Sequence, residues 1–98
     1  MLRIETHQEP EITSFTIEGK LMGAWVSELE KCWQAATTNG ACKFKVNLSE
    51  VAFIDSQGKE LLTRMYRQGA RLVPSGCLMK AIVEEIEATV STENPPSG

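Results

Sequence analysis

The spacing of hydrophobic residues changes at one point in the middle of the chain. Residues 44–48 alternate between apolar and polar side chains, which is typical of a strand with one covered face. After a polar junction at residues 55–58, apolar residues recur every three or four positions, which predicts an amphipathic helix. A strand therefore leads into a helix N-terminus here. Unpaired backbone N–H groups at such a helix start need acceptors, and Asp55 and Ser56 supply suitable oxygens.

The same kind of pattern predicts elements on both sides of this junction. Two alternating stretches, at residues 2–6 and 13–18, indicate a β-hairpin, and residues 70–73 indicate a fourth strand before a proline. The three helices are expected to end near residues 37–40, 68–69 and 90, the first of them closed by Gly40. The apolar stripes of the first and third helices, expected to face the core, consist of Trp25, Leu29, Cys32, Trp33 and Ala36, and of Leu78, Met79, Ile82, Val83 and Ile86.

The order of these elements, β-β-α-β-α-β-α, predicts an α/β domain with a small mixed sheet of about four strands. Lys43 and Lys45 alternate with apolar residues of the central strand, whereas a strand buried on both faces would be apolar throughout. We therefore expect the three helices mainly on one face of the sheet. Residues 1–90 should form this single domain, and the polar residues 91–98 should form a flexible C-terminal tail.

Composition restricts the class of function. The 98 residues, of which 42% are hydrophobic and 23% charged, are typical of one globular domain. The net charge of -3 and the absence of a basic face argue against a nucleic acid or an anionic membrane as partner. No apolar run is long enough for membrane insertion, and the N-terminal residues lack the apolar core of a signal peptide, so we expect a cytoplasmic protein.

The cysteines do not form a recognisable framework. There are three of them, no C-x-x-C pair, and a single histidine, His7, so neither a metal nor a cofactor is expected. Cys42 and Cys77 are interpreted as buried small hydrophobic residues.

The junction also resembles a known family signature. The motif N-L-S-x-V-x-F-I-D-S-x-G at residues 47–58 resembles that of STAS domains, the fold of bacterial anti-sigma factor antagonists and of the cytoplasmic tail of sulfate transporters. Leu21-x-Gly23 resembles the segment before the family's first helix, and residues 69–72 resemble the strand after its second helix. The resemblance spans roughly residues 5–87 and implies helices mainly on one side of a small mixed sheet.

This resemblance implies that Ser56 is phosphorylated by a partner that is both an anti-sigma factor and a serine kinase. A serine phosphatase is a further expected partner. A phosphoryl group at Ser56 would lie at a helix N-terminus, where the amides of Gln57, Gly58 and Lys59 favour an anion. It would add about -1.5 to -2 charges, enough to disrupt a partner surface fitted to a neutral hydroxyl. The residues expected to bind the partner are Leu21, Gly23, Asp55, Ser56, Gln57, Gly58 and Lys59.

Several of these residues have a second interpretation. Asp55 or Ser56 can be simply an N-cap, and Asp55 can also orient the hydroxyl or the metal–nucleotide of a docked kinase. Gly58 lies on the inward stripe and should let helix and sheet approach closely. Trp25 and Trp33, eight residues apart, are interpreted as core residues rather than a ligand platform.

Three positions depart from the family pattern. Gln57 stands where a second serine is common, so Ser56 is the only hydroxyl of the junction. Lys59 replaces a usual leucine and, one helical turn from Ser56, could pair with a phosphate. Asn47 replaces the usual aspartate, which we place at the end of the central strand, and so removes one negative charge.

The leading hypothesis is a binding module that captures an anti-sigma factor while Ser56 is unphosphorylated and releases it after phosphorylation. The alternative is a STAS subunit or scaffold that docks on an ABC or sulfate-type transporter without a phosphoryl switch. An enzyme with Asp55 and Ser56 as a hydrolytic pair would lack a base, since His7 is far from the junction in sequence, so no catalytic residue is expected.

Overall fold

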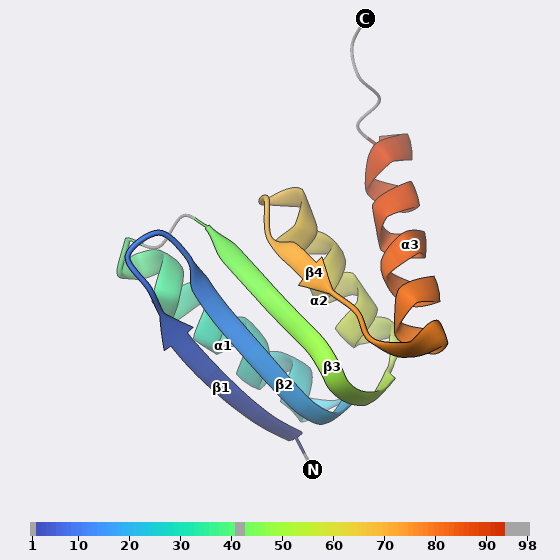
Figure 1. Ribbon diagram of the computed structural model, residues 1–98, viewed down its shortest axis with the longest axis horizontal. Helices are drawn as coiled ribbons and strands as arrows, with labels where there is room; N and C mark the ends of the chain where they lie inside the picture. The colour runs from blue at the N-terminus through green and yellow to red at the C-terminus, as the bar shows by residue number, and fades with distance from the viewer. Residues whose placement is uncertain (1, 41–42, 94–98) are drawn as a thin grey trace, which may run out of the picture.

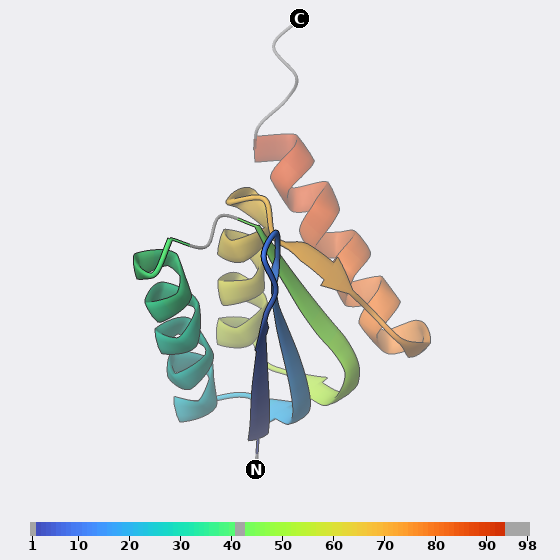
Figure 2. The same cartoon turned by 60° about the vertical axis from the view of Figure 1, so that its left-hand side comes forward.

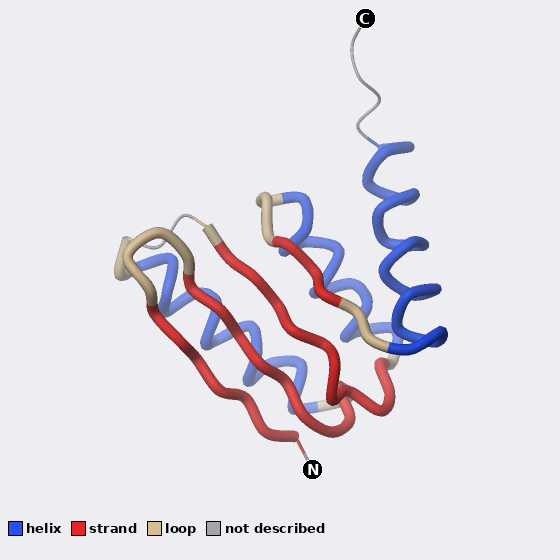
Figure 3. The backbone as a smooth tube through the Cα atoms, viewed as in Figure 1, coloured by secondary structure: helices blue, strands red, loops and turns tan. Residues whose placement is uncertain are grey.

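A four-stranded β-sheet and three α-helices make up the fold (Figures 1 and 3). The computed structural model describes residues 2–40 and 43–93. The elements are, in chain order, β1 (Leu2–Gln8), β2 (Thr13–Leu21), α1 (Ala24–Thr38), β3 (Phe44–Ile54), α2 (Ser56–Arg67), β4 (Arg71–Val73) and α3 (Gly76–Glu93).

The strands lie in the order β1-β2-β3-β4. β1 and β2 form an antiparallel hairpin, while β3 pairs in parallel with both β2 and β4. Leu21 at the end of β2 is paired with Ile54 at the end of β3. The carboxyl ends of these two strands therefore meet at one edge of the sheet, and the helices α1 and α2 both start from that edge (Figure 1).

The helices are gathered mainly on one face, as expected from the alternation in the central strand. Figure 2 shows α1 and α2 side by side on the same face of the sheet, and α3 packs mainly against α2. Phe44 and Val46 of β3 are buried under the helices, while Lys45 is exposed on the opposite face. The mixed four-stranded sheet and the element order predicted from the sequence are confirmed.

β3 is longer than its alternating pattern suggested. The strand continues to Ile54, and its buried positions change spacing after Leu48, to Val51 and then Ile54. The pairing with β2 shifts twice in this region, and each shift places one extra residue in β3. An extra residue reverses the side to which the following side chains point. The alternation of apolar and polar residues therefore ends at the bulges, although the strand itself continues to Ile54.

The apolar stripe predicted for α1 is only partly correct. Leu29 and Ala36 are buried, but Trp25 is 38% exposed and Val26 occupies the inward position next to it. A helix that rests on a sheet buries one face, and Trp25 lies about 100° around the helix from Val26. Trp33 and Cys32 pack partly against the core.

The stripe predicted for α3 needs a similar correction. Met79, Val83 and Ile86 are buried and Ile82 is partly buried, but Leu78 is 60% exposed. α3 leans chiefly on α2 rather than on the sheet, so it buries a narrower stripe.

Two further expectations concern cysteines and the chain end. Cys77, interpreted as buried, is exposed in the first turn of α3, whereas Cys42 lies outside the described residues. α3 continues to Glu93, three residues beyond the expected domain boundary at Val90. The remaining part of the expected tail, residues 94–98, also lies outside the described residues.

Candidate functional site

Asp55 connects the two segments that resemble the family motif. It is the N-cap of α2, and its Oδ1 accepts a hydrogen bond of 2.7 Å from the backbone N–H of Gly58. Its Oδ2 accepts a bond of 3.1 Å from the N–H of Gly23, which precedes α1. Its own N–H donates to the carbonyl of Leu21 at 3.1 Å. One aspartate therefore holds the starts of both helices; we call Leu21, Gly23, Asp55 and Gly58 the Asp55 junction.

The sequence did not show that these two segments touch, because Gly23 and Asp55 are 32 residues apart. They meet because β2 and β3 are parallel and end at the same edge of the sheet. From the sequence, this contact could have been found only through a prediction that the two strands before Gly23 and Asp55 run parallel to each other. Asp55 as a helix cap, one of the alternatives left open by the sequence, is confirmed.

At Gly58 the backbone of α2 lies close to the sheet. It is buried, and a Cβ built on it would lie 2.8 Å from the carbonyl oxygen of Leu21 and 3.0 Å from Cγ2 of Ile54. Both distances are shorter than an unstrained contact, so α2 could not lie in this position with a larger residue there. The close approach expected of this glycine is confirmed.

Ser56 is the first residue of α2 and is exposed. Asp55 provides the cap, so the other sequence alternative, in which Ser56 caps the helix, is wrong. In the part of the chain that the structure describes, the Ser56 hydroxyl has no hydrogen-bond partner. The hydroxyl is thus presented at the surface next to a rigid backbone and has no structural task of its own.

The amides around Ser56 are less available than expected. The N–H of Gly58 donates to the Asp55 carboxylate, and the N–H of Lys59 donates to the Asp55 carbonyl at 2.9 Å. Two of the three amides expected to favour a phosphate therefore already have acceptors.

Lys59 also lies differently from the expectation. Its ammonium group forms an ion pair with the carboxylate of Glu85 on α3. A phosphate at Ser56 would have to compete with Glu85 for this lysine. Five residues further along α2, Arg64 pairs with Glu30 of α1 at 2.7 Å. The two pairs hold α2 to both neighbouring helices. They border a groove of about 570 Å³ whose lining residues are Ser56, Lys59, Glu60, Thr63, Arg64, Arg67 and Thr89.

Asn47 is not at the end of the central strand. It is the fourth residue of β3, is paired with Thr16 and Val73, and its side chain accepts a hydrogen bond from the N–H of Ser49. The expected placement of this residue was wrong because the bulged half of β3 was not recognised. Its charge difference from the family pattern therefore lies within the sheet, away from the Asp55 junction.

Three large apolar side chains border the Asp55 junction and remain exposed. Met22 is 41% exposed and lies between Leu21 and Gly23, and Trp25 follows in the first turn of α1. Phe53 is 43% exposed and lies two residues before Asp55. We call Met22, Trp25 and Phe53 the apolar rim. Exposed apolar side chains close in sequence to such a junction are candidates for contact with another protein.

Groups suited to a metal are missing among the described residues, where no cluster of three or more His, Cys, Asp or Glu side chains occurs. His7 lies on β1, where its ring is 4.0 Å from the Glu5 carboxylate. The Asp55 carboxylate is already occupied by two backbone N–H groups.

Within residues 2–40 and 43–93, the structure contains no helix with the length and apolar character needed to cross a membrane.

The sheet order and the capped start of α2 together define a small α/β module that presents one serine at the carboxyl edge of its parallel strands. The chain belongs to the STAS domain family, whose model matches residues 3–74. None of the curated proteins is similar enough to count as a relative.

Solved structures similar to this chain include three anti-sigma factor antagonists. One from Mycobacterium paratuberculosis has a TM-score of 0.78 at 16% identity and covers 97% of this chain and 84% of its own. The antagonist SpoIIAA in its unphosphorylated form has a TM-score of 0.69 at 17% identity and covers 96% and 99%. A STAS domain from Rhodobacter sphaeroides has a TM-score of 0.57 at 16% identity and covers 74% and 85%. At these identities the likeness establishes the fold, which agrees with the STAS fold expected from the sequence.

Proposed function

We propose that this chain is a phosphorylation-controlled binding protein of the anti-sigma factor antagonist type. It captures an anti-sigma factor that is also a serine kinase while Ser56 carries a free hydroxyl, and it releases that partner once Ser56 is phosphorylated. The observation that carries the proposal is that Asp55 performs the capping, which leaves the exposed Ser56 hydroxyl without a structural role. A serine in that position can accept a phosphoryl group without loss of the fold.

The partner surface would consist of the Asp55 junction, Ser56, Gln57, Lys59 and the apolar rim. The junction is rigid because one carboxylate holds both helix starts, so little conformational entropy is lost when a partner binds to it. The rim supplies exposed apolar area for contact with a partner. Such a surface fits a partner with an apolar contact patch better than it fits a charged polymer.

The phosphate would act through charge rather than through a change of fold. It would add about -1.5 to -2 charges next to the apolar rim, and burying an unpaired charge against a partner is costly. Lys59 lies one turn from Ser56 on the same groove but is already paired with Glu85. The phosphate therefore competes with Glu85 for Lys59, the only lysine among the described residues that line the groove. Most of the phosphate's charge then remains uncompensated and faces the partner.

The remaining assignments follow from this function. A serine phosphatase restores the free hydroxyl, the protein acts in the bacterial cytoplasm where anti-sigma factors work, and the chain itself needs no catalytic residue. The transporter-docked STAS subunit is the alternative, and it predicts no phosphorylation of Ser56.

The direct test is intact-mass spectrometry of the protein after incubation with ATP and a lysate of its source cells. We expect a gain of one phosphate that is absent in Ser56→Ala. No gain, in a lysate that phosphorylates a control kinase substrate, would overturn the phosphorylation switch and favour the transporter-docked alternative.

Binding is tested with the labelling kinase once it is purified. Ser56→Asp should abolish capture and leave the unfolding temperature nearly unchanged. Ser49→Asp is the matched control, because Ser49 is also exposed but lies outside the Asp55 junction and the apolar rim, and this variant should bind normally. Equal binding by both variants would contradict a partner surface centred on Ser56.

A further inference from the structure

The two edge strands of the sheet, β4 and β1, differ in how well they are protected against pairing with another strand. β4 has only three residues and is followed by Pro74, which limits how far another strand could pair with it. β1 has seven residues, contains neither lysine nor proline, and pairs with β2 without a register shift. Among the described elements, none lies against the outer side of β1 (Figures 1 and 2). β1 therefore presents a regular row of backbone donors and acceptors to solvent.

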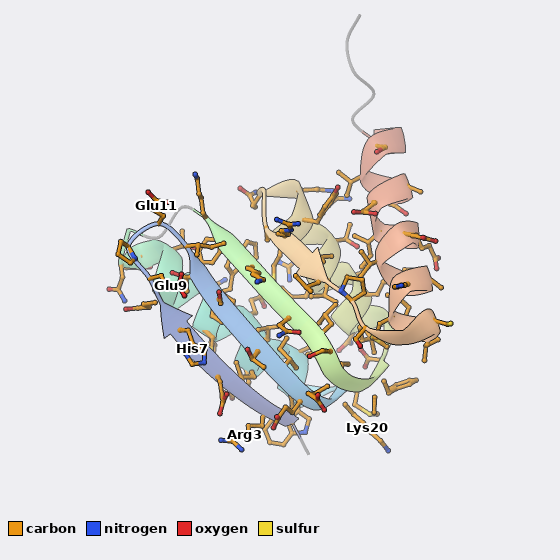
Figure 4. All side chains as sticks on the ribbon, viewed as in Figure 1. Arg3, His7, Glu9, Glu11 and Lys20 are labelled. Atoms are coloured by element: carbon orange, nitrogen blue, oxygen red, sulfur yellow. The ribbon has the colours of Figure 1, made fainter. Side chains whose placement is uncertain are left out.

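The side chains of β1 carry a charge pattern that is complementary to itself. Arg3 and Glu5 lie on the open face of the sheet, where they form an ion pair of 2.7 Å with each other, and their side chains are 69% and 41% exposed, so both remain accessible to a second copy. Figure 4 shows Arg3 and His7 on β1 at the outer border of the molecule. If two copies of β1 pair antiparallel around a twofold axis at Ile4, each Arg3 lies opposite Glu5 of the other copy. Two opposite-charge pairs then form across the new strand pair.

The alternative registers are less favourable. In a continuous sheet whose helices from both copies lie on the same side, residues that face each other across the new strand pair must point to the same face of the sheet. The twofold axis must therefore pass through a residue of β1 and not between two residues. An axis at Glu5 would place the two Glu5 carboxylates opposite each other and Arg3 opposite His7. An axis at Thr6 would leave Arg3 outside the paired segment and would place Ile4 opposite Gln8. Only the axis at Ile4 combines charge pairs with an apolar contact.

The region around Ile4 has the shape needed for such a contact. Ile4 is only partly buried, although it packs against the core. A shallow depression opens beside it, and its lining residues are Leu2, Arg3, Ile4, Glu18 and Gly19. On the helix side, the axis at Ile4 would place the two Ile4 side chains opposite each other and Leu2 opposite Thr6.

We propose that β1 is a self-association surface through which a second copy of this chain pairs antiparallel, around an axis at Ile4, to give a continuous eight-stranded sheet. The proposal is independent of the phosphorylation switch, because β1 lies at the opposite border of the sheet from β4 and contributes nothing to the Asp55 junction. The paired segment extends only from residue 2 to residue 6, and small interfaces are typical of weak association. We therefore expect weak association, with a dissociation constant of roughly 10–100 µM.

The test uses sedimentation equilibrium over a wide range of protein concentration. The wild type should show a monomer–dimer equilibrium. Arg3→Glu and Glu5→Arg should each weaken self-association by at least about tenfold, because both attractive pairs become repulsive. An equimolar mixture of these two variants should associate at least as tightly as the wild type, because every facing pair then has opposite charges.

The mixture of Arg3→Glu and Glu5→Arg also distinguishes pairing of β1 around Ile4 from a general effect of net charge on association. Lys45→Glu, which makes the same charge change on the same open face away from the edge, is the matched control and should dimerise like the wild type. Circular dichroism and thermal unfolding of each variant establish that it is folded. A wild type that stays monomeric at the highest concentration, dimers that are unaffected by Arg3→Glu, or a mixture that does not associate would each overturn the proposal.

Discussion

Replacement of Gly58 by alanine tests how α2 is positioned, because two physical effects predict changes of opposite sign in the free energy of unfolding. Alanine is the better helix former by about 1 kcal/mol, so the propensity of an exposed helix position predicts a more stable protein. At Gly58, however, the added Cβ would lie 2.8 Å from the Leu21 carbonyl oxygen and 3.0 Å from Cγ2 of Ile54. The first of these atoms belongs to the backbone and cannot rotate away.

Overpacking of this kind costs typically about 1–3 kcal/mol. Movement of α2 away from β2 would also lengthen the 2.7 Å bond from the Gly58 N–H to Asp55. After subtraction of the gain in helix propensity and addition of the loss from the weakened hydrogen bond, we expect Gly58→Ala to lower the free energy of unfolding by about 1–2 kcal/mol. For a domain of this size, that corresponds to a decrease of about 4–16 °C in the unfolding temperature.

The assay is urea unfolding followed by circular dichroism, where the midpoint should fall while the slope is unchanged. Gln57→Ala serves as the control, because Gln57 is the exposed neighbour in the same helical turn and its replacement should be nearly neutral. A Gly58→Ala variant that is as stable as the wild type, or more stable, would refute the close approach of α2 to β2.

Two further predictions concern the Asp55 junction and its neighbour. Asp55→Ala removes the acceptor for both Gly58 and Gly23 and should cost about 2–3 kcal/mol, whereas Asp55→Asn keeps one acceptor and should cost about half as much in chemical denaturation. Equal losses in the two variants would mean that the acceptor kept by asparagine contributes nothing, and would contradict the role of Asp55 as a double acceptor. A double-mutant cycle with Lys59→Met and Glu85→Gln should give a coupling of about 0.2–1 kcal/mol that decreases in high salt, and a coupling insensitive to salt would contradict an ionic contact.

Much of the fold could be predicted from local patterns in the sequence. The periods of two and of nearly four residues indicated the strands and helices in the right order, and the polar junction at residues 55–58 indicated where β3 gives way to α2. The role of Gly58 was predictable as well, because a glycine on an inward helical stripe lowers helix propensity and is favoured where the backbone must approach a neighbour closely. These features depend on residues close to one another in the chain.

The tertiary structure alone decided which distant residues share a surface. Gly23 meets Asp55 because β2 and β3 end at the same edge, and Lys59 is occupied because α3 places Glu85 beside it. Trp25 and Leu78 fit an apolar stripe by spacing, yet each is exposed because the packing of α1 and α3 selects a narrower face. Helical periodicity defines which residues share a face of one element, but only the position of the neighbouring elements determines whether that face is covered.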